Sequence, residues 1–226
     1  MSLKIENINK IFYRDVGEAN YFEVLKNINL EIKDGEFVEI IGKSGSGKTT
    51  LLNVASGLLN PEEGHIYIDD VDLYSLDDKK RSIFRNKNLS VVPQGQTGLQ
   101  NLTVLENVLL PSYLYTKEDK TNDALSLLEK VDILPLKDCY PNELSGGELR
   151  RMVIARALVM DPKILFMDEP TGDLDDDNTK KVLNILKDVK ESGKIIFMVT
   201  HDKDAIKYAD KVFKMDNGVL IPYQEQ

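Results

Sequence analysis

The chain has 226 residues and carries 29 Lys and Arg against 38 Asp and Glu, a formal net charge of −9 at pH 7 with both histidines neutral. With 42% hydrophobic and 30% charged residues, the composition is that of a folded globular protein rather than a disordered one. The negative charge excludes a broad binding surface for DNA, RNA or anionic lipid, so any phosphate site must be local.

Cysteine and histidine are too scarce to build a covalent or metal framework. The single Cys139 has no partner for an intramolecular disulfide, and two histidines are too few for a Cys/His zinc cluster, which favours a reducing cytosol. The first residues have no apolar signal core, and the apolar runs are far shorter than the roughly 18 residues of a membrane span. We expect a cytoplasmic protein with no direct membrane insertion and no nucleic-acid partner.

Apolar runs bounded by turn residues alternate with helical patterns along the chain, which is typical of an α/β fold. Two apolar stripes predict helices over 51–59 and 182–189, and Gly193 is expected to end the second. The predicted strands are mostly continuous rather than alternating, as in parallel strands covered on both faces. They are 37–41, 89–92, 164–167 and 195–200.

The stretch from Gln94 to about Asn142 differs from the rest of the chain. It holds helical patterns at 104–110 and 124–131 and no run typical of a buried strand. We therefore expect a helical subdomain, at about 95–160, inserted in the α/β core of a single domain that spans 1–226.

Residues 42–49 read Gly-Lys-Ser-Gly-Ser-Gly-Lys-Thr, a complete P-loop pattern between a predicted strand and a predicted helix. Glycines let the backbone N–H groups and the helix N-terminus point at a polyphosphate, while Lys48 reaches the β and γ oxygens and Thr49 ligates Mg²⁺. The alternative, a merely flexible loop, would match by chance in about one chain in a hundred. The implied ligands are ATP and Mg²⁺, with the nucleotide bound by Gly42, Lys43, Ser44, Gly45, Ser46, Gly47, Lys48, Thr49 and Thr50.

The predicted strand at 164–167 runs directly into two carboxylates, Asp168 and Glu169. Asp168 is expected beside the metal at the carboxyl end of the strand. Glu169 points elsewhere, where it can polarise a water for in-line attack on the γ-phosphate. The alternative is that both are solvated residues of a turn at the end of the strand.

Leu144-Ser145-Gly146-Gly147-Glu148, followed by a long helical pattern, resembles the signature of the ATP-binding-cassette (ABC) ATPases. That family orders its motifs as Walker A, Q-loop, signature, Walker B, D-loop and H-loop, and the remaining matches here are Gln94, Asp175 and His201. The resemblance covers essentially the whole chain. It implies the α/β fold of a P-loop NTPase ABC cassette, with a mostly parallel core sheet, an N-terminal antiparallel β part and an inserted helical subdomain.

The signature precedes a helical pattern, so Ser145, Gly146 and Gly147 offer a second anion-binding helix N-terminus. In the family that the chain resembles, two such surfaces meet in a head-to-tail homodimer, and each ATP lies between the P-loop of one subunit and the signature of the other. The resemblance therefore implies a homodimer when ATP is bound, with Asp175 of the D-loop also at the nucleotide.

The resemblance also implies catalytic and metal-binding roles. The catalytic residues are Glu169, His201 and Gln94, and the metal ligands are Thr49, Gln94 and Asp168. His201 is implied to contact the γ-phosphate, whereas the usual alternative for a lone histidine is a packed place in the core. His65 has no such context and is expected to be an ordinary strand residue. Adenine is implied to stack on an aromatic side chain, with Phe12 favoured and Tyr13 the second choice.

The loop after the two carboxylates departs from the family pattern at one position. Asp173 replaces the Asn that is common before Leu174-Asp175, which adds a negative charge near the expected dimer interface. A calcium loop is the alternative for this acidic run, but its sixth and twelfth positions are Asn178 and Asn184 instead of Gly and Glu. We expect Asp176 or Asp177 to cap the helix that follows.

Within the family, the chain resembles the lipoprotein-release and macrolide-exporter group, whose longer first hairpin fits the polar segment from Arg14 to Glu23. The resemblance implies an ATPase that drives a separate integral membrane permease from the inner face of the cell membrane. The cargo would be a macrolide, an antimicrobial peptide or a lipoprotein, exported or extracted by mechanical coupling. The coupling helix of the permease is expected to dock on the helical region at 94–142.

Two alternatives stay open. A cell-division ABC ATPase has the same motifs but signals through its membrane partner without transporting a substrate, and the long segment from Arg14 to Glu23 counts against it. A soluble ABC protein of translation or DNA repair would carry two cassettes or a long coiled coil before the signature, and no heptad run separates Gly42 from Leu144.

Overall fold

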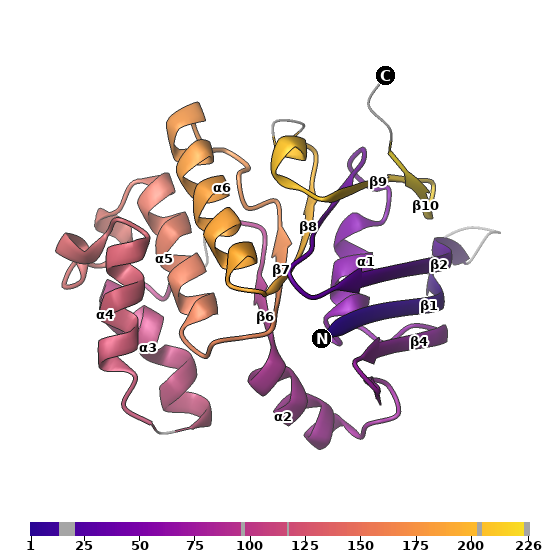
Figure 1. Cartoon of the computed structure of the whole chain (residues 1–226), viewed down its shortest axis with the longest axis horizontal. Helices are drawn as coiled ribbons and strands as arrows, with labels where there is room; N and C mark the ends of the chain where they lie inside the picture. The colour runs from indigo at the N-terminus through magenta and orange to yellow at the C-terminus, as the bar shows by residue number, and fades with distance from the viewer. Residues whose placement is uncertain (14–20, 96–97, 117, 203–204, 224–226) are drawn as a thin grey trace.

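The computed structural model describes residues 1–13, 21–95, 98–116, 118–202 and 205–223. Within these residues the chain forms a four-stranded sheet, a six-stranded sheet and a layer of helices (Figure 1). Of the polar segment 14–23, residues 21–23 belong to a strand and residues 14–20 lie outside the described part.

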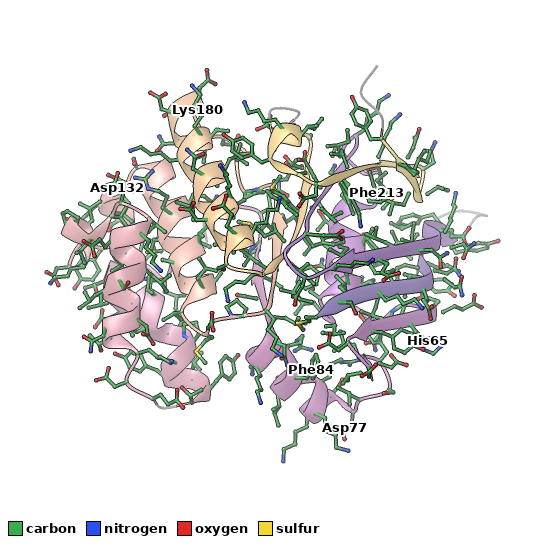
Figure 2. All side chains as sticks on the ribbon, in the orientation of Figure 1. His65, Asp77, Phe84, Asp132, Lys180 and Phe213 are labelled. Carbon is green, nitrogen blue, oxygen red and sulfur yellow. The ribbon has the colours of Figure 1, made fainter. Side chains whose placement is uncertain are left out.

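The four-stranded sheet is antiparallel and contains the N-terminus. Its strands are β1 (Ser2–Tyr13), β2 (Tyr21–Lys33), β4 (Glu63–Ile68) and β5 (Val71–Asp72), in the order β2-β1-β4-β5. β1 pairs with β2 on one side and with β4 on the other. His65 lies on β4 at the outer side of the molecule (Figure 2), where its Nδ1 is 2.8 Å from an Asp72 carboxylate oxygen. It is the strand residue that the sequence predicts.

The six-stranded sheet is the core of the fold and is mostly parallel. Its order is β10-β9-β3-β8-β7-β6, and every neighbouring pair is parallel except β9 with β10. The strands are β3 (Phe37–Ile41), β6 (Leu89–Val92), β7 (Ile164–Asp168), β8 (Ile195–Thr200), β9 (Lys211–Asp216) and β10 (Val219–Pro222). The four predicted strands are thus confirmed, and the residues of β3, β7 and β8 are all buried.

The core sheet is covered on both faces, which explains why its strands are continuous apolar runs. Val38, Phe166 and Phe197 belong to a buried cluster shared with α1 (Lys48–Ala55) and the antiparallel sheet. Leu165 and Met198 belong to a second cluster, shared with the helices on the opposite face. When both faces of a parallel strand are buried, no side of it contacts solvent, so polar residues do not alternate with apolar ones.

The segment between β6 and β7 is helical, as predicted, and forms the layer farthest from the antiparallel sheet (Figure 1). Every helix in the described residues falls short of the length and hydrophobicity that crossing a bilayer takes. Besides α1, the helices are α2 (Asp78–Asn88), α3 (Val104–Tyr115), α4 (Thr121–Lys130), α5 (Gly146–Leu158) and α6 (Asp176–Glu191), with short 3₁₀ turns at Leu134–Leu136, Pro141–Glu143 and Ile206–Tyr208.

Two predicted helix ends are wrong by a few residues. The stripe over 51–59 extends beyond α1, which ends at Ala55 because Gly57 adopts a left-handed φ of 74° and turns the chain. The second helix begins at Asp176 because the Asp175 side chain accepts a hydrogen bond from the Asn178 backbone. Asp175, and neither of the two aspartates after it, is therefore the N-cap. Gly193 follows the helix, as predicted.

Candidate functional site

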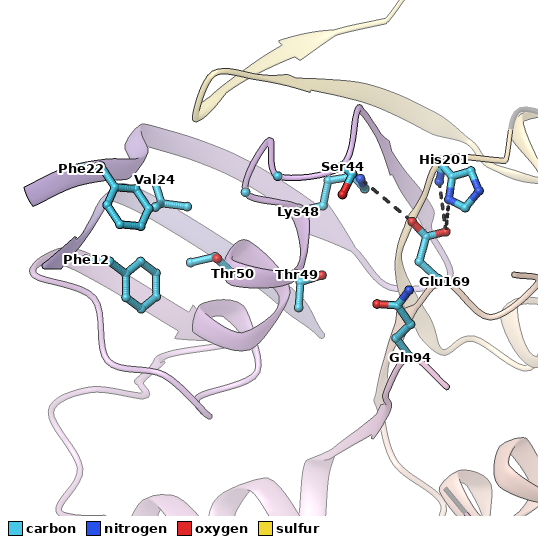
Figure 3. Close-up of a pocket in the computed structure, with 12 residues that line it drawn as sticks. Phe12, Phe22, Val24, Ser44, Lys48, Thr49, Thr50, Gln94, Glu169 and His201 are labelled. Carbon is cyan, nitrogen blue, oxygen red and sulfur yellow. Dashed lines mark hydrogen bonds and ion pairs between the residues drawn. The ribbon is translucent and has the colours of Figure 1, made fainter. Parts of the chain in front are cut away.

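A cleft of about 740 Å³ lies where the carboxyl ends of the parallel strands face the antiparallel sheet (Figure 3). Such an edge is where open α/β sheets bind ligands, because the connecting loops diverge there. Strands β1 and β2, the P-loop, α1 and the ends of β6, β7 and β8 all contribute. The lining residues are Phe12, Phe22, Val24, Ser44, Gly45, Gly47, Lys48, Thr49, Thr50, Gln94, Glu169 and His201.

The P-loop folds around its own lysine. The Lys48 ammonium donates to the carbonyl oxygens of Gly42 and Lys43, at 2.8 and 3.2 Å. Gly47 precedes α1 with a φ of 108°, and a Cβ there would lie 2.9 Å from the Val24 carbonyl oxygen. Only glycine combines this backbone angle with such a close approach. The loop thus places a partly buried cation at the N-terminus of α1, an arrangement suited to a polyphosphate.

Asp168 ends β7 with an unsatisfied oxygen. The side chain is hydrogen-bonded to Thr49, and its Oδ1 is buried with no hydrogen-bond partner in the part of the chain that the structure describes. Burial raises the pKa of Asp168 above its usual value, and the hydrogen bond from Thr49 opposes that rise. A buried carboxylate oxygen beside a hydroxyl fits a divalent cation that takes oxygen ligands. The predicted magnesium ligands Thr49 and Asp168 are thus in contact, and Gln94 lines the same cleft.

Glu169 lines the cleft, with its side chain near Lys48 and His201 (Figure 3). Its Oε2 accepts hydrogen bonds from the Thr200 hydroxyl at 2.9 Å and the His201 backbone N–H at 3.1 Å, and lies 2.9 Å from His201 Nδ1. Its Oε1 is 4.0 Å from the Lys48 ammonium. The residue itself has a left-handed φ of 48°. Hydrogen bonds therefore hold one oxygen of the Glu169 carboxylate, and the other oxygen faces the Lys48 ammonium in the P-loop.

His201 is a surface residue of the cleft rather than a core histidine. Its side chain is 70% exposed, whereas the Glu169 side chain that it contacts is 9% exposed. An imidazole in this position is free to reach a ligand in the cleft. The structure therefore overturns the alternative of a packed core position.

The end of the cleft opposite Glu169 is aromatic. Phe12 and Phe22 are cross-strand partners on β1 and β2, with ring centroids 5.9 Å apart and an interplanar angle of 27°. Both line the cleft, whereas Tyr13 lies outside its lining and is 75% exposed. Successive side chains on a strand point to opposite faces, which separates Phe12 from Tyr13. Phe22 has no motif of its own in the sequence, because its place beside Phe12 depends on the register between β1 and β2.

The signature and the D-loop residue lie apart from this cleft. Ser145 caps α5, and its hydroxyl and backbone N–H both contact the Glu148 carboxylate, at 2.7 and 2.8 Å. These bonds hold the pKa of Glu148 below its usual value. Gly147 packs against Asn178, which in turn donates to Asp175. One chain therefore carries two separate surfaces, and the predicted residues Ser145, Gly146, Gly147 and Asp175 are all on the second.

Glu39 is a buried acid, within reach of the charges of Asp202 and Glu169, that no sequence motif marks. It lies in β3, is 0% exposed, and neither carboxylate oxygen has a hydrogen-bond partner among the described residues. Burial, together with the negative charges of Asp202 and Glu169, raises the pKa of Glu39 to about 8. At pH 7 this side chain is therefore mostly neutral in the folded state.

The raised pKa predicts a pH-dependent stability. The folded-state value exceeds the unfolded value of 4.5, so the contribution of protonated Glu39 is fully present at low pH and is lost as pH rises through 8. Glu39→Gln stays neutral at every pH. The difference in unfolding free energy, variant minus wild type, should therefore rise by about 4 kcal/mol between pH 5 and pH 9. Urea unfolding at several pH values measures this difference. Parallel profiles for the two proteins would contradict the assignment.

Comparison with known proteins agrees with these motifs. The ABC transporter family model matches residues 25–172. The chain is 40% identical over 201 residues to the lipoprotein-releasing system ATP-binding protein LolD of Saccharophagus degradans, which covers 88% of each chain. It is 39% identical to the macrolide export ATP-binding/permease protein MacB of Chlorobaculum tepidum, over 97% of this chain and 33% of that longer protein.

Among solved structures, a dimeric post-hydrolysis state of the ATP-binding cassette MJ0796 bound to ADP and Pi matches with a TM-score of 0.86. The match covers 96% of each chain at 34% sequence identity. This likeness spans both sheets and the helical layer, and the family model spans the P-loop and both carboxylates. The chain therefore belongs to the ABC transporter family, as the ATP-binding and ATP-hydrolysing subunit of a transporter.

Proposed function

We propose that the residues gathered in the cleft bind and hydrolyse MgATP. The observation that carries the proposal is the Glu169 carboxylate, held between His201 and Lys48 at the rim of a P-loop. Lys48 and the backbone N–H groups of the P-loop bind the β- and γ-phosphates. Phe12 stacks on adenine, and Phe22 widens the apolar surface on which the base rests.

Thr49, Asp168 and Gln94 are the residues that would hold Mg²⁺. The cation supplies charge neutralisation and polarisation of the phosphoryl oxygens when bound. The unsatisfied Asp168 Oδ1 and the adjacent Thr49 hydroxyl support this choice, since Mg²⁺ in nucleotide sites takes few protein ligands beside phosphates and waters.

Glu169 orients the attacking water and accepts its proton. The Thr200 hydroxyl and the His201 backbone N–H fix one oxygen of the carboxylate, so the other is the acceptor that faces the phosphate-binding loop. His201 is placed to donate to the transferred phosphoryl group, since its ring is exposed to the cleft. A carboxylate fixed in this way needs no rearrangement before it meets the water.

The signature and D-loop surface completes the site of a second subunit. Ser145, Gly146 and Gly147 form the N-terminus of α5 outside the cleft, and Asp175 lies beside them through Asn178. Two copies arranged head to tail bring this surface over the P-loop of the other copy, and a symmetric pair satisfies both sites at once. ATP then joins two chains, and loss of the γ-phosphate lets the homodimer open.

A groove of about 270 Å³ between α2, α3 and α5 is the proposed docking site of the permease. Leu58 and Tyr115 give it an apolar surface, and each is 55% exposed. Arg85 and Arg156 add positive charge. This combination suits a cytoplasmic helix of the permease with apolar and acidic side chains on one face. The groove extends the docking region predicted at 94–142 to α2 and to the end of α1.

The complete proposal is a single domain over 1–226, with a helical subdomain at about 95–160, peripheral on the inner face of the cell membrane. It powers export or extraction of a macrolide, an antimicrobial peptide or a lipoprotein by mechanical coupling, which the likeness to LolD and MacB supports. Co-purification from native membranes identifies the permease. A permease encoded with cell-division proteins and acting without cargo would replace this transport role with the signalling alternative.

The groove offers a matched pair of variants for that experiment. Tyr113 and Tyr115 lie on α3 and are each 55% exposed, but only Tyr115 lines the groove. Tyr115→Glu places a negative charge among docking contacts and should lower the yield of co-purified permease by at least about tenfold. Tyr113→Glu should retain the permease and the ATPase activity. Equal retention by both variants would contradict docking at this groove.

A further inference from the structure

Three of the family motifs meet at a second, much smaller cavity of about 50 Å³. Gly95 follows the Q-loop, Gly146 belongs to the signature, and Asp173 and Leu174 belong to the loop that leads to the D-loop residue. Arg150 of α5 lines the same cavity and is 7% exposed. One side chain is therefore in reach of segments that are far apart in the sequence.

Arg150 connects the signature helix to the Q-loop. Its Nη1 donates a hydrogen bond to the carbonyl oxygen of Pro93, at 3.2 Å, and Pro93 directly precedes Gln94. A hydrogen bond between a buried guanidinium and a carbonyl is charge-assisted and is stronger than a neutral one. A displacement of α5 is therefore transmitted to the segment that carries Gln94.

Arg150 also faces the acidic loop after β7. Burial lowers the pKa of the Arg150 side chain, and the negative charges of Asp173 and Asp168 oppose this change. A buried cation is destabilising unless an opposite charge lies nearby. The negative charge of Asp173 therefore stabilises the charged form of Arg150. Asp173 has a left-handed φ of 61°, a conformation that Asn and Asp adopt more readily than other side chains.

The next residue of the helix makes a parallel connection. Arg151 is 4% exposed, and its Nη1 donates to the Asn178 side chain at 2.7 Å. Asn178 in turn donates to both carboxylate oxygens of Asp175, at 3.1 and 2.9 Å. Arg151 thus connects α5 to Asp175 through hydrogen bonds, and Arg150 lines a cavity together with Asp173 at the other end of the loop.

We propose that Arg150, which lines this cavity together with Asp173, is a positioning residue that locks the signature helix to the segments that carry the Q-loop and the D-loop. The proposal rests on the proposed function, because the signature and the D-loop act on the nucleotide of the partner subunit. Arg150 itself is not among the described residues that line the cleft. Its loss should therefore lower kcat and leave the ATP affinity of the single chain unchanged.

The kinetic test compares Arg150→Gln, Arg150→Lys, Asp173→Asn and the double variant Arg150→Gln with Asp173→Asn. Arg150→Gln should lower kcat about tenfold with the ATP dissociation constant within twofold of wild type, and Arg150→Lys, which keeps the charge, should stay within about threefold. Asp173→Asn should cost clearly less in the Arg150→Gln background than in wild type, since the partner charge is already absent. Lys187→Gln, which removes an exposed cation on α6, is the control.

Hydrogen exchange on the ATP-free single chain tests the lock without reference to the dimer. Peptides that contain 93–95 and 171–175 should exchange about tenfold faster in Arg150→Gln, and Lys187→Gln should match wild type. Unchanged exchange, a kcat within twofold of wild type, or costs that multiply in the double variant would each overturn the inference. If Arg150→Gln does not fold, the measurement uses Arg150→Lys and Asp173→Asn instead. Hydrogen exchange should then be faster in Asp173→Asn than in Arg150→Lys.

The two proposals fail in different ways. If a hydrolysis-deficient Glu169→Gln protein does not dimerise with ATP, the proposed function fails, and the exchange measurement still decides whether the lock exists. If that protein dimerises and the additional Arg150→Gln substitution leaves dimerisation and exchange unchanged, the inference fails and the proposed function stands.

Discussion

Glu169→Gln is expected to lower ATP turnover by about 10²- to 10⁴-fold while MgATP still binds. Glutamine keeps the size of the side chain, and its amide oxygen can still accept the hydrogen bonds that Thr200 and His201 donate to the carboxylate. It has no basic carboxylate oxygen, so it cannot take the proton of the attacking water. The loss should appear in kcat rather than in the affinity for ATP.

Phosphate release under saturating MgATP measures the turnover, and size-exclusion chromatography with light scattering measures the assembly. The variant should accumulate as an ATP-bound dimer, because the state before hydrolysis cannot decay. Glu191→Gln neutralises an exposed carboxylate on α6. It is the matched control and should behave as wild type. Turnover of Glu169→Gln within a few-fold of wild type would remove Glu169 from the reaction.

Lys48→Ala is expected to weaken ATP binding about 10- to 100-fold. The Lys48 side chain is 8% exposed, and the carbonyl oxygens of Gly42 and Lys43 hold its ammonium group in the P-loop. A charge-assisted hydrogen bond to a phosphate contributes about 1.5 to 3 kcal/mol, which sets this range. The loss should appear in the dissociation constant as well as in turnover.

Calorimetric titration with MgATP measures the affinity directly. Lys180→Ala removes an equal charge from an exposed side chain of α6 (labelled in Figure 2) that is not among the residues lining the cleft, and it controls for the change in net charge. Wild-type affinity in Lys48→Ala would contradict the phosphate-binding role. A loss of equal size in Lys180→Ala would attribute the effect to net charge instead of to the P-loop.

The net charge of −9 takes on a local meaning in the structure. The chain binds a highly anionic nucleotide although acidic residues outnumber basic ones. Lys48, the N-terminus of α1 and the cation that Asp168 and Thr49 would hold concentrate positive potential at one end of a single cleft. Partly buried charges of this kind act at short range and are screened less than surface charges.

The parts of the fold that sequence predicts well are those written in local patterns. The strands at 37–41 and 164–167 are continuous apolar runs because both faces of the core sheet are covered, and the P-loop is a contiguous motif. The helical layer is likewise visible as helical patterns between β6 and β7. None of these features requires knowledge of which distant residues meet.

Features that depend on distant contacts were not predictable. Phe22 joins the cleft only through its register with Phe12, and the burial of Glu39 depends on what covers β3. The hydrogen bond from Arg150 to Pro93 spans 57 residues of sequence. The N-cap at Asp175 was misplaced by one or two residues, because several aspartates in a row compete for that position and only the backbone decides between them.

Complementation between two inactive variants tests the shared ATP site most directly. Lys48→Ala damages the P-loop and keeps the signature, whereas Ser145→Arg places a bulky side chain at the N-terminus of α5 and keeps the P-loop. In a head-to-tail dimer, each homodimer has two damaged sites, but a mixed dimer has one site in which both halves are intact.

The ATPase activity of an equimolar mixture should therefore rise above the mean of the two separate variants, to about one quarter of wild type when subunits exchange freely. Dimers that form through one intact site should also appear by light scattering when MgATP is added to the mixture and not to either variant alone. An activity equal to the mean of the separate variants, with exchange of subunits demonstrated, would contradict a site built from two chains.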